Sequence, residues 1–148
     1  MHETFRVKIF LVLCSLLISC KIRPAVPSIG YKFKLYDNGD FLSIVDSNNI
    51  AVVYGPILSF DFDSTFIIAM ERPQDSVPGF RTLNLKEYEK AFSESHFCQF
   101  WILDNTKQPR NVEPTEVNKS VYGPLNFIEY KSMRIKLGVP ENLKLKTE

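Results

Sequence analysis

The first half of the chain consists of short runs of strand-forming residues separated by turn residues. The runs cover residues 31–36, 41–45, 50–54, 58–62 and 65–71. The segments between them include Asp37-Asn38-Gly39-Asp40, residues 46–49, Gly55-Pro56 and residues 63–64. Asp and Asn side chains, the free φ of glycine and the fixed φ of proline all favour chain reversal. Because connections this short join antiparallel neighbours, the pattern predicts a β-meander.

Two helix starts are visible in the second half. Asn84 followed by Glu87, and Asn126 followed by Glu129, have the spacing of a capping box. An apolar stripe with helical period follows each pair, and Gly138 is expected to end the second helix. Both segments are therefore predicted to be amphipathic helices.

One more strand is expected between the helices, at residues 97–103, followed by a polar segment at 104–120. Hydrophobic residues make up 45% of the chain and aromatic residues 13%, which suffices for a folded core. We therefore predict one α+β domain over residues 31–148, with two helices and an antiparallel sheet of about five or six strands, the N-terminal meander plus one later strand. The net charge of +1 gives no sign of a nucleic-acid partner.

The N-terminus carries a targeting signal. The apolar segment at residues 9–18 is about half as long as the roughly 20 residues that a membrane-spanning helix needs, so it fits a signal peptide better. The run Leu16-Leu17-Ile18-Ser19-Cys20 resembles the lipobox of bacterial lipoproteins. This resemblance implies that residues 1–19 are a lipoprotein signal peptide and that Cys20 is the lipidated N-terminus of the mature protein.

Two alternatives to lipidation stay open. A plain secretory signal would need a small residue at position 17, where the chain has Leu17. An uncleaved signal anchor would need a longer apolar run. If Cys20 carries two or more acyl chains, the resulting membrane anchor is stable, whereas a single chain holds a protein only marginally.

Residues 20–30 contain two prolines and no strand or helix period, so we expect a short, stiff tether after the lipid. Its first residues, Lys21 to Arg23, include no acid. In bacterial lipoproteins an Asp directly after the cysteine favours retention in the inner membrane, and acidic residues there favour surface export in some bacteria. The resemblance therefore implies the outer membrane, facing the periplasm.

Few residues are available for catalysis. His96 is the sole histidine beyond residue 19, and Cys98 is the sole cysteine beyond Cys20. A Cys-His or Ser-His-Asp site would have to use His96, but closeness in sequence does not supply the oriented base and nucleophile that such a site requires. A buried, inert thiol within the predicted strand is the simpler interpretation.

Asp61 and Asp63 lie on one face of a predicted strand, where two carboxylates can bind a cation or share a proton. The simpler prediction is a solvated strand face, with Asp63 serving the turn. The sequence contains no CxxC, HExxH or phosphate-binding loop. We predict no catalytic residue, no metal ligand and no cofactor, and Cys20 as the one modified residue.

Aromatic residues are numerous enough for some to be exposed as a binding patch, although core packing is the more common use. The residues concerned are Tyr31, Tyr36, Tyr54, Phe60, Phe62 and Trp101.

The motifs Val121-Tyr122-Gly123-Pro124-Leu125 and Leu137-Gly138-Val139-Pro140 resemble the C-terminal signature of a family of small, uncharacterised bacterial lipoproteins containing a domain of unknown function. The resemblance implies an envelope location and this fold class but no activity. We therefore expect a non-enzymatic binding or accessory module, held to the membrane by Cys20, with another envelope protein as its partner. The alternative is a small envelope enzyme or inhibitor that uses His96 and Cys98.

Overall fold

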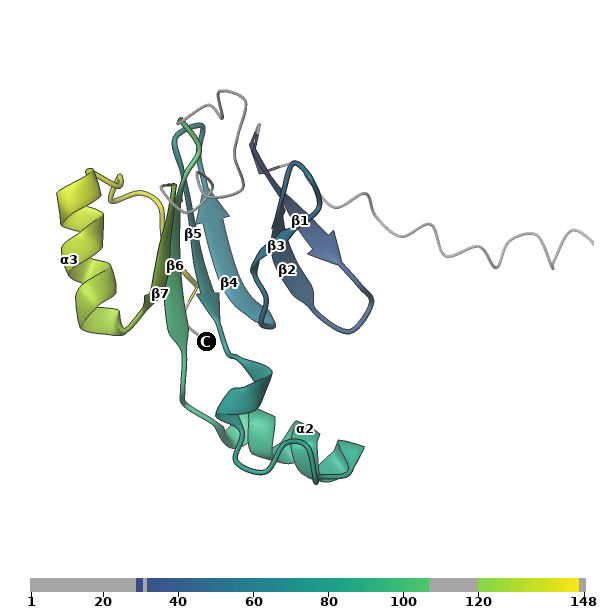
Figure 1. The fold of residues 1–148 in the computed structure, drawn as a ribbon. Coiled ribbons are helices and arrows are strands. Elements are labelled where there is room, and N and C mark those ends of the chain that lie inside the picture. The colour runs from purple at the N-terminus through teal and green to yellow at the C-terminus, as the bar shows by residue number, and fades with distance from the viewer. Residues whose placement is uncertain (1–28, 31, 107–119, 147–148) are drawn as a thin grey trace, which may run out of the picture.

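The structure is a computed structural model, and it describes residues 29–30, 32–106 and 120–146. Within these residues seven strands form two antiparallel sheets (Figure 1). The strands are β1 (Phe33–Asp37), β2 (Leu42–Asp46), β3 (Ala51–Val53), β4 (Ile57–Phe62), β5 (Phe66–Glu71), β6 (Gln99–Asp104) and β7 (Val121–Leu125). The helices are the short 3₁₀ turn η1 (Gln74–Ser76) and the α-helices α2 (Leu85–Glu94) and α3 (Phe127–Leu137).

The α+β class, the antiparallel pairing and the two α-helices agree with the sequence-based prediction, whereas the single sheet of five or six strands is wrong. The strand order is β1-β2-β3 in one sheet and β4-β5-β6-β7 in the other. Gly55-Pro56 was expected to be a turn within one meander. It is instead the point at which the chain passes from the first sheet to the second, so β3 and β4 do not pair.

Strand β7 was not predicted, because glycine and proline disfavour strand interiors. Proline is tolerated here since β7 is the outer strand of its sheet and pairs only with β6. Gly123 is required by close packing, because a Cβ atom at this position would lie 2.5 Å from the Trp101 ring.

The main core lies between the two sheets. In β5, Ile67 and Ala69 face the three-stranded sheet, whereas Phe66 and Ile68 face α3, as the period of two in a strand requires. The buried members of the core between the sheets are Ile29, Phe33, Leu35, Ile44, Val53, Ile67, Ala69 and Leu103. The folded part thus includes Ile29, within the range expected to be the tether.

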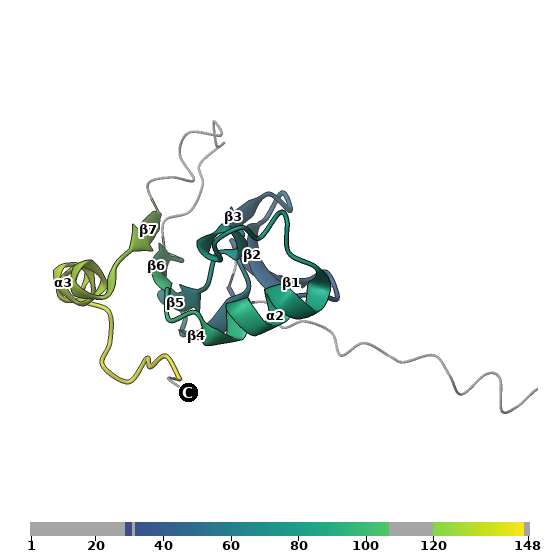
Figure 2. The same cartoon turned by 90° about the horizontal axis from the view of Figure 1, so that it is seen from below.

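Helix α3 covers the other face of the four-stranded sheet, which gives three layers (Figure 2). Its residue Tyr130 is buried and stacks on Phe100 of β6, with 5.0 Å between the ring centroids. The chain after α3 returns across this face, where Arg134 donates to the carbonyls of Pro140 and Leu143 at 2.7 and 2.8 Å. The segment that leaves α3 is therefore fixed to the body of the domain.

Helix α2 lies at one end of the two sheets (Figures 1 and 2). None of its residues is buried. Arg72, which follows β5, donates to the Phe92 carbonyl at 2.7 Å, and its guanidinium lies 5.1 Å from the centre of the Phe92 ring. Arg72 thus links the helix to the end of β5, while no residue of the helix is part of the buried core.

Candidate functional site

Cys20, the predicted lipidation site, lies outside the described residues, as do the signal peptide at 1–19 and most of the tether at 20–30. Lipid attachment therefore stays a prediction. Within the part of the chain that the structure describes, no helix is long and apolar enough to cross a membrane.

Asp61 and Asp63 have separate structural roles. The Asp63 carboxylate accepts from the backbone N–H groups of Thr65 and Phe66 at 2.6 and 2.7 Å, which closes the turn between β4 and β5 as predicted. The Asp61 carboxylate accepts from the backbone N–H of Lys144 at 2.9 Å and so holds the C-terminal segment against β4. The simpler prediction placed Asp61 on a solvated strand face. In the structure it is instead half-buried against the C-terminal segment.

His96 and Cys98 precede β6, so Cys98 does not lie within a strand as predicted. His96 is exposed, and Cys98 is a half-buried free thiol. Across the sheet, Asp61 of β4 lies level with Ile68 of β5 and Ile102 of β6. Cys98 comes just before Gln99, the first residue of β6. The strand between Gln99 and Ile102 alone spans about 10 Å, so the structure does not bring either acid to His96 and Cys98.

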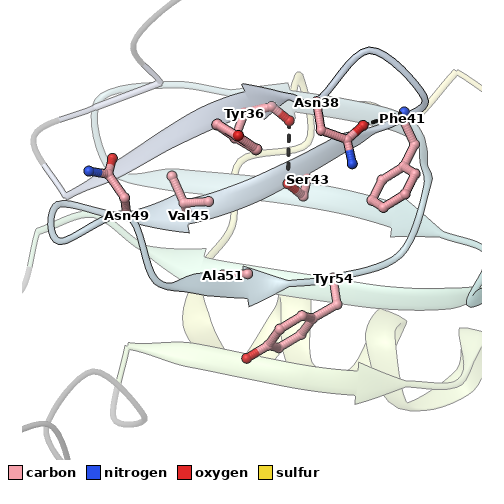
Figure 3. A pocket seen from close by; sticks show the side chains of 8 residues that line it. All are labelled: Tyr36, Asn38, Phe41, Ser43, Val45, Asn49, Ala51 and Tyr54. Atoms are coloured by element: carbon pink, nitrogen blue, oxygen red, sulfur yellow. Dashed lines mark hydrogen bonds between the residues drawn. The ribbon is translucent and has the colours of Figure 1, made fainter.

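The outer face of the β1-β2-β3 sheet carries a hollow of about 580 Å³. Ser43, Val45 and Ala51 form its floor, and the aromatic side chains of Tyr36, Phe41 and Tyr54 surround it (Figure 3). Asn38 and Asn49 complete the lining. Tyr36 and Tyr54 are 53% and 70% exposed, so the hollow combines apolar contact area with hydroxyl and amide groups.

The six aromatic residues considered for an exposed patch divide between this hollow, the core and other positions. Tyr36 and Tyr54 contribute to the hollow. Trp101 and Phe60 pack instead against the core between the sheets, Phe62 is exposed elsewhere, and Tyr31 lies outside the described residues. Phe41, which also lines the hollow, was not among the aromatic residues considered.

A second pocket, of about 280 Å³, lies beside the hollow and shares Tyr54 with it. Glu71, at the end of β5, lines this pocket although only 4% of the residue is exposed. The other lining residues are Gly55, Pro73, Gln74, Asp75 and Phe80. The carboxylate of Glu71 accepts from the Gly55 backbone N–H at 3.3 Å.

Burial raises the pKa of Glu71, and the nearby charge of Asp75 raises it further. The Gly55 N–H and the Trp101 indole act in the opposite direction. The Trp101 indole N–H lies near the carboxylate, but its Nε1 forms no hydrogen bond with it, so its support for the charged form is weak. Glu71 is therefore a buried carboxylate with weak support from the protein, which is typical of functional sites as well as of structural networks.

Sequence reasoning missed the Glu71 pocket. The residue stands at the end of an apolar run, where a charged side chain usually marks the return of the chain to solvent. The close approach of Gly55 gave no local signal, although a Cβ atom there would lie 3.1 Å from the Glu71 carboxyl carbon. Among the described residues, no group of three or more His, Cys, Asp or Glu side chains could hold a metal ion.

The structure is a small α+β domain with two neighbouring pockets. Residues 41–148 match a family described as protein of unknown function (DUF3997), and the chain belongs to this family. No curated protein and no solved structure matches the chain. The match supports the expected membership in a family with a domain of unknown function, while the lipobox remains a resemblance.

Proposed function

We propose that this protein is a lipid-anchored, non-enzymatic binding or accessory module of the bacterial cell envelope. Its binding surface is the outer face of the β1-β2-β3 sheet, and its occupant is a neutral, extended segment of another envelope protein. The observation that carries the proposal is the hollow between Tyr36, Phe41 and Tyr54.

The chemistry of the hollow favours this occupant. None of its eight lining residues carries a formal charge, so an uncharged segment fits it without an unpaired buried ion. Exposed tyrosines supply large contact areas at a low cost in side-chain entropy. The Asn49 amide can pair with backbone groups of an extended chain, since an amide both donates and accepts. The Asn38 amide can donate through its NH₂ group, while its oxygen already accepts from the backbone N–H groups of Asp40 and Phe41.

The proposed location follows from the N-terminus. The lipobox-like run ending at Cys20 supports anchoring through lipid on that residue, and Lys21 and Arg23 support the outer membrane, facing the periplasm. The near-neutral charge of the chain supports a partner other than nucleic acid.

Photocrosslinking in the intact envelope tests this function. Benzoylphenylalanine at Asn49, on the rim of the hollow, is expected to give one discrete protein adduct in the full-length, anchored protein. The same group at Ile135, which is 84% exposed on α3, serves as the control and is expected to give no such adduct.

The double variant Tyr36→Ser and Tyr54→Ser should remove most of the adduct, because truncating a central aromatic contact typically costs about 2 kcal/mol or more of binding free energy. Equal crosslinking from Asn49 and Ile135 would contradict the proposal. An adduct degraded by a muramidase and resistant to protease would replace the protein partner with a cell-wall glycan.

A further inference from the structure

Glu71 has no cationic partner within the described residues. Its carboxylate accepts from Gly55 and the residue is 4% exposed, yet no Lys, Arg or His nitrogen of that part of the chain lies within 4.0 Å of the carboxylate. The neighbouring Arg72 points to Phe92, and the Arg81 guanidinium lies over the Phe80 ring at 5.5 Å. A buried carboxylate without a counter-charge is costly, since desolvation penalises the ion and one long hydrogen bond from Gly55 offsets only part of that penalty.

The walls of the pocket suit a cation. Tyr54 and Phe80 place aromatic side chains in its lining, and Asp75 adds a second carboxylate at the exposed side. Aromatic faces attract ammonium groups, and a buried carboxylate gives a cation a strong, charge-assisted hydrogen bond. At about 280 Å³ the pocket has room for an alkyl chain end but not for a large ligand.

We infer that the Glu71 pocket is a binding site for a primary alkylammonium group. The ammonium donates to the Glu71 carboxylate, while the alkyl chain lies between Tyr54 and Phe80. This group is found at the end of a lysine side chain and in free small amines. The site does not depend on the function proposed for the neighbouring hollow.

Titration of the full-length protein in neutral detergent micelles with n-butylammonium chloride tests this inference. Trp101, the single tryptophan of the chain, contributes to the surroundings of Glu71, so its fluorescence reports binding. We expect a saturable change with butylammonium and none with n-butanol or sodium chloride at the same concentrations. A response to butanol equal to that of butylammonium would overturn the inference.

Two matched variants separate the site from general charge effects. Glu71→Gln should weaken butylammonium binding at least tenfold by calorimetry, whereas Glu89→Gln, the same change at an exposed position on α2, should leave it unaltered. If Glu71→Gln does not fold, Phe80→Leu replaces it and should weaken binding about threefold or more, because the aromatic contact with the alkyl chain is lost. Unchanged affinity in the folded variant would overturn the inference.

Two further probes distinguish the sources of the ammonium group. Nα-acetyl-lysine-N-methylamide presents it as a lysine residue does, and cadaverine presents it as a free amine. Binding of the lysine derivative with the same dependence on Glu71 supports a protein side chain as the ligand, and binding of cadaverine alone supports a small amine. If neither binds, the inference fails, whether or not the crosslinking at Asn49 succeeds.

Discussion

At the scale of single residues, Glu71 is an acid in a buried position, where the charged form lowers the stability of the fold. Its pKa is raised above the ordinary 4.5, chiefly by burial. The stabilising contribution of the protonated group is therefore fully present below pH 4.5 and is lost as the pH rises through the folded-state value. A buried acid that destabilises the fold near neutral pH fits a binding role better than a structural one.

The variant Glu71→Gln should therefore be at least as stable as the native protein at pH 7, because Gln still accepts from Gly55 and carries no charge. Urea denaturation between pH 4 and pH 7 measures this. The native protein should lose stability across this interval relative to Glu71→Gln, and Glu89→Gln should follow the native curve. If Glu71→Gln and the native protein have the same pH dependence, the carboxylate is not destabilised by burial.

The residues of the candidate site differ in how far the sequence reveals them. Tyr36 and Tyr54 were recognised as aromatic residues that could be exposed, because the chain has more aromatic residues than one face of a small sheet has to bury. Glu71 was not recognised, since its surroundings come from Gly55 and Trp101, far away along the chain. Burial of an acid at a strand end depends on tertiary contacts, which a local pattern does not encode.

At the scale of elements, the two capped helices should respond differently to the same mutation. Asn84 and Asn126 both cap their helices in complete capping boxes, as the sequence predicts. Helix α3 buries Tyr130 against the sheet, whereas α2 buries no residue. Because α2 contributes little to the core, its local unfolding should not unfold the domain.

Asn126→Ala should accordingly lower the free energy of unfolding by about 1 kcal/mol. Asn84→Ala should leave the urea midpoint almost unchanged while accelerating amide hydrogen exchange within α2. Equal losses of global stability in the two variants would show instead that α2 is an integral part of the cooperative unit.

Element types were easier to predict than their assembly. Periods of two and capping boxes located six strands and both α-helices within a few residues. The division into two sheets was missed because Gly55-Pro56 looks the same in sequence whether the next strand pairs with the last one or joins another sheet. Strand β7 was missed because its Pro124 is acceptable only on an outer strand, and that position is fixed by the whole sheet.

At the scale of the whole molecule, the hollow lies on the outer face of the β1-β2-β3 sheet, and the Glu71 pocket adjoins it where β3 and β5 end. The two pockets share Tyr54. A ligand with a neutral extended part and one ammonium group could occupy both. Shallow surfaces of this kind bind weakly on their own. Confinement of both partners to one membrane raises their effective concentration and compensates for weak affinity.

The variant Cys20→Ala tests this role of the anchor. We expect the protein to leave the membrane fraction, because every acyl chain attached through Cys20 is lost. It should keep its thermal midpoint and its butylammonium affinity, since Cys20 lies outside the described fold. The crosslink from Asn49 should fall sharply, because the partner now meets a dilute protein. Unchanged fractionation together with unchanged electrophoretic mobility would rule out lipidation at Cys20. If the protein is released but its crosslink from Asn49 is undiminished, the surface binds tightly enough to need no anchor.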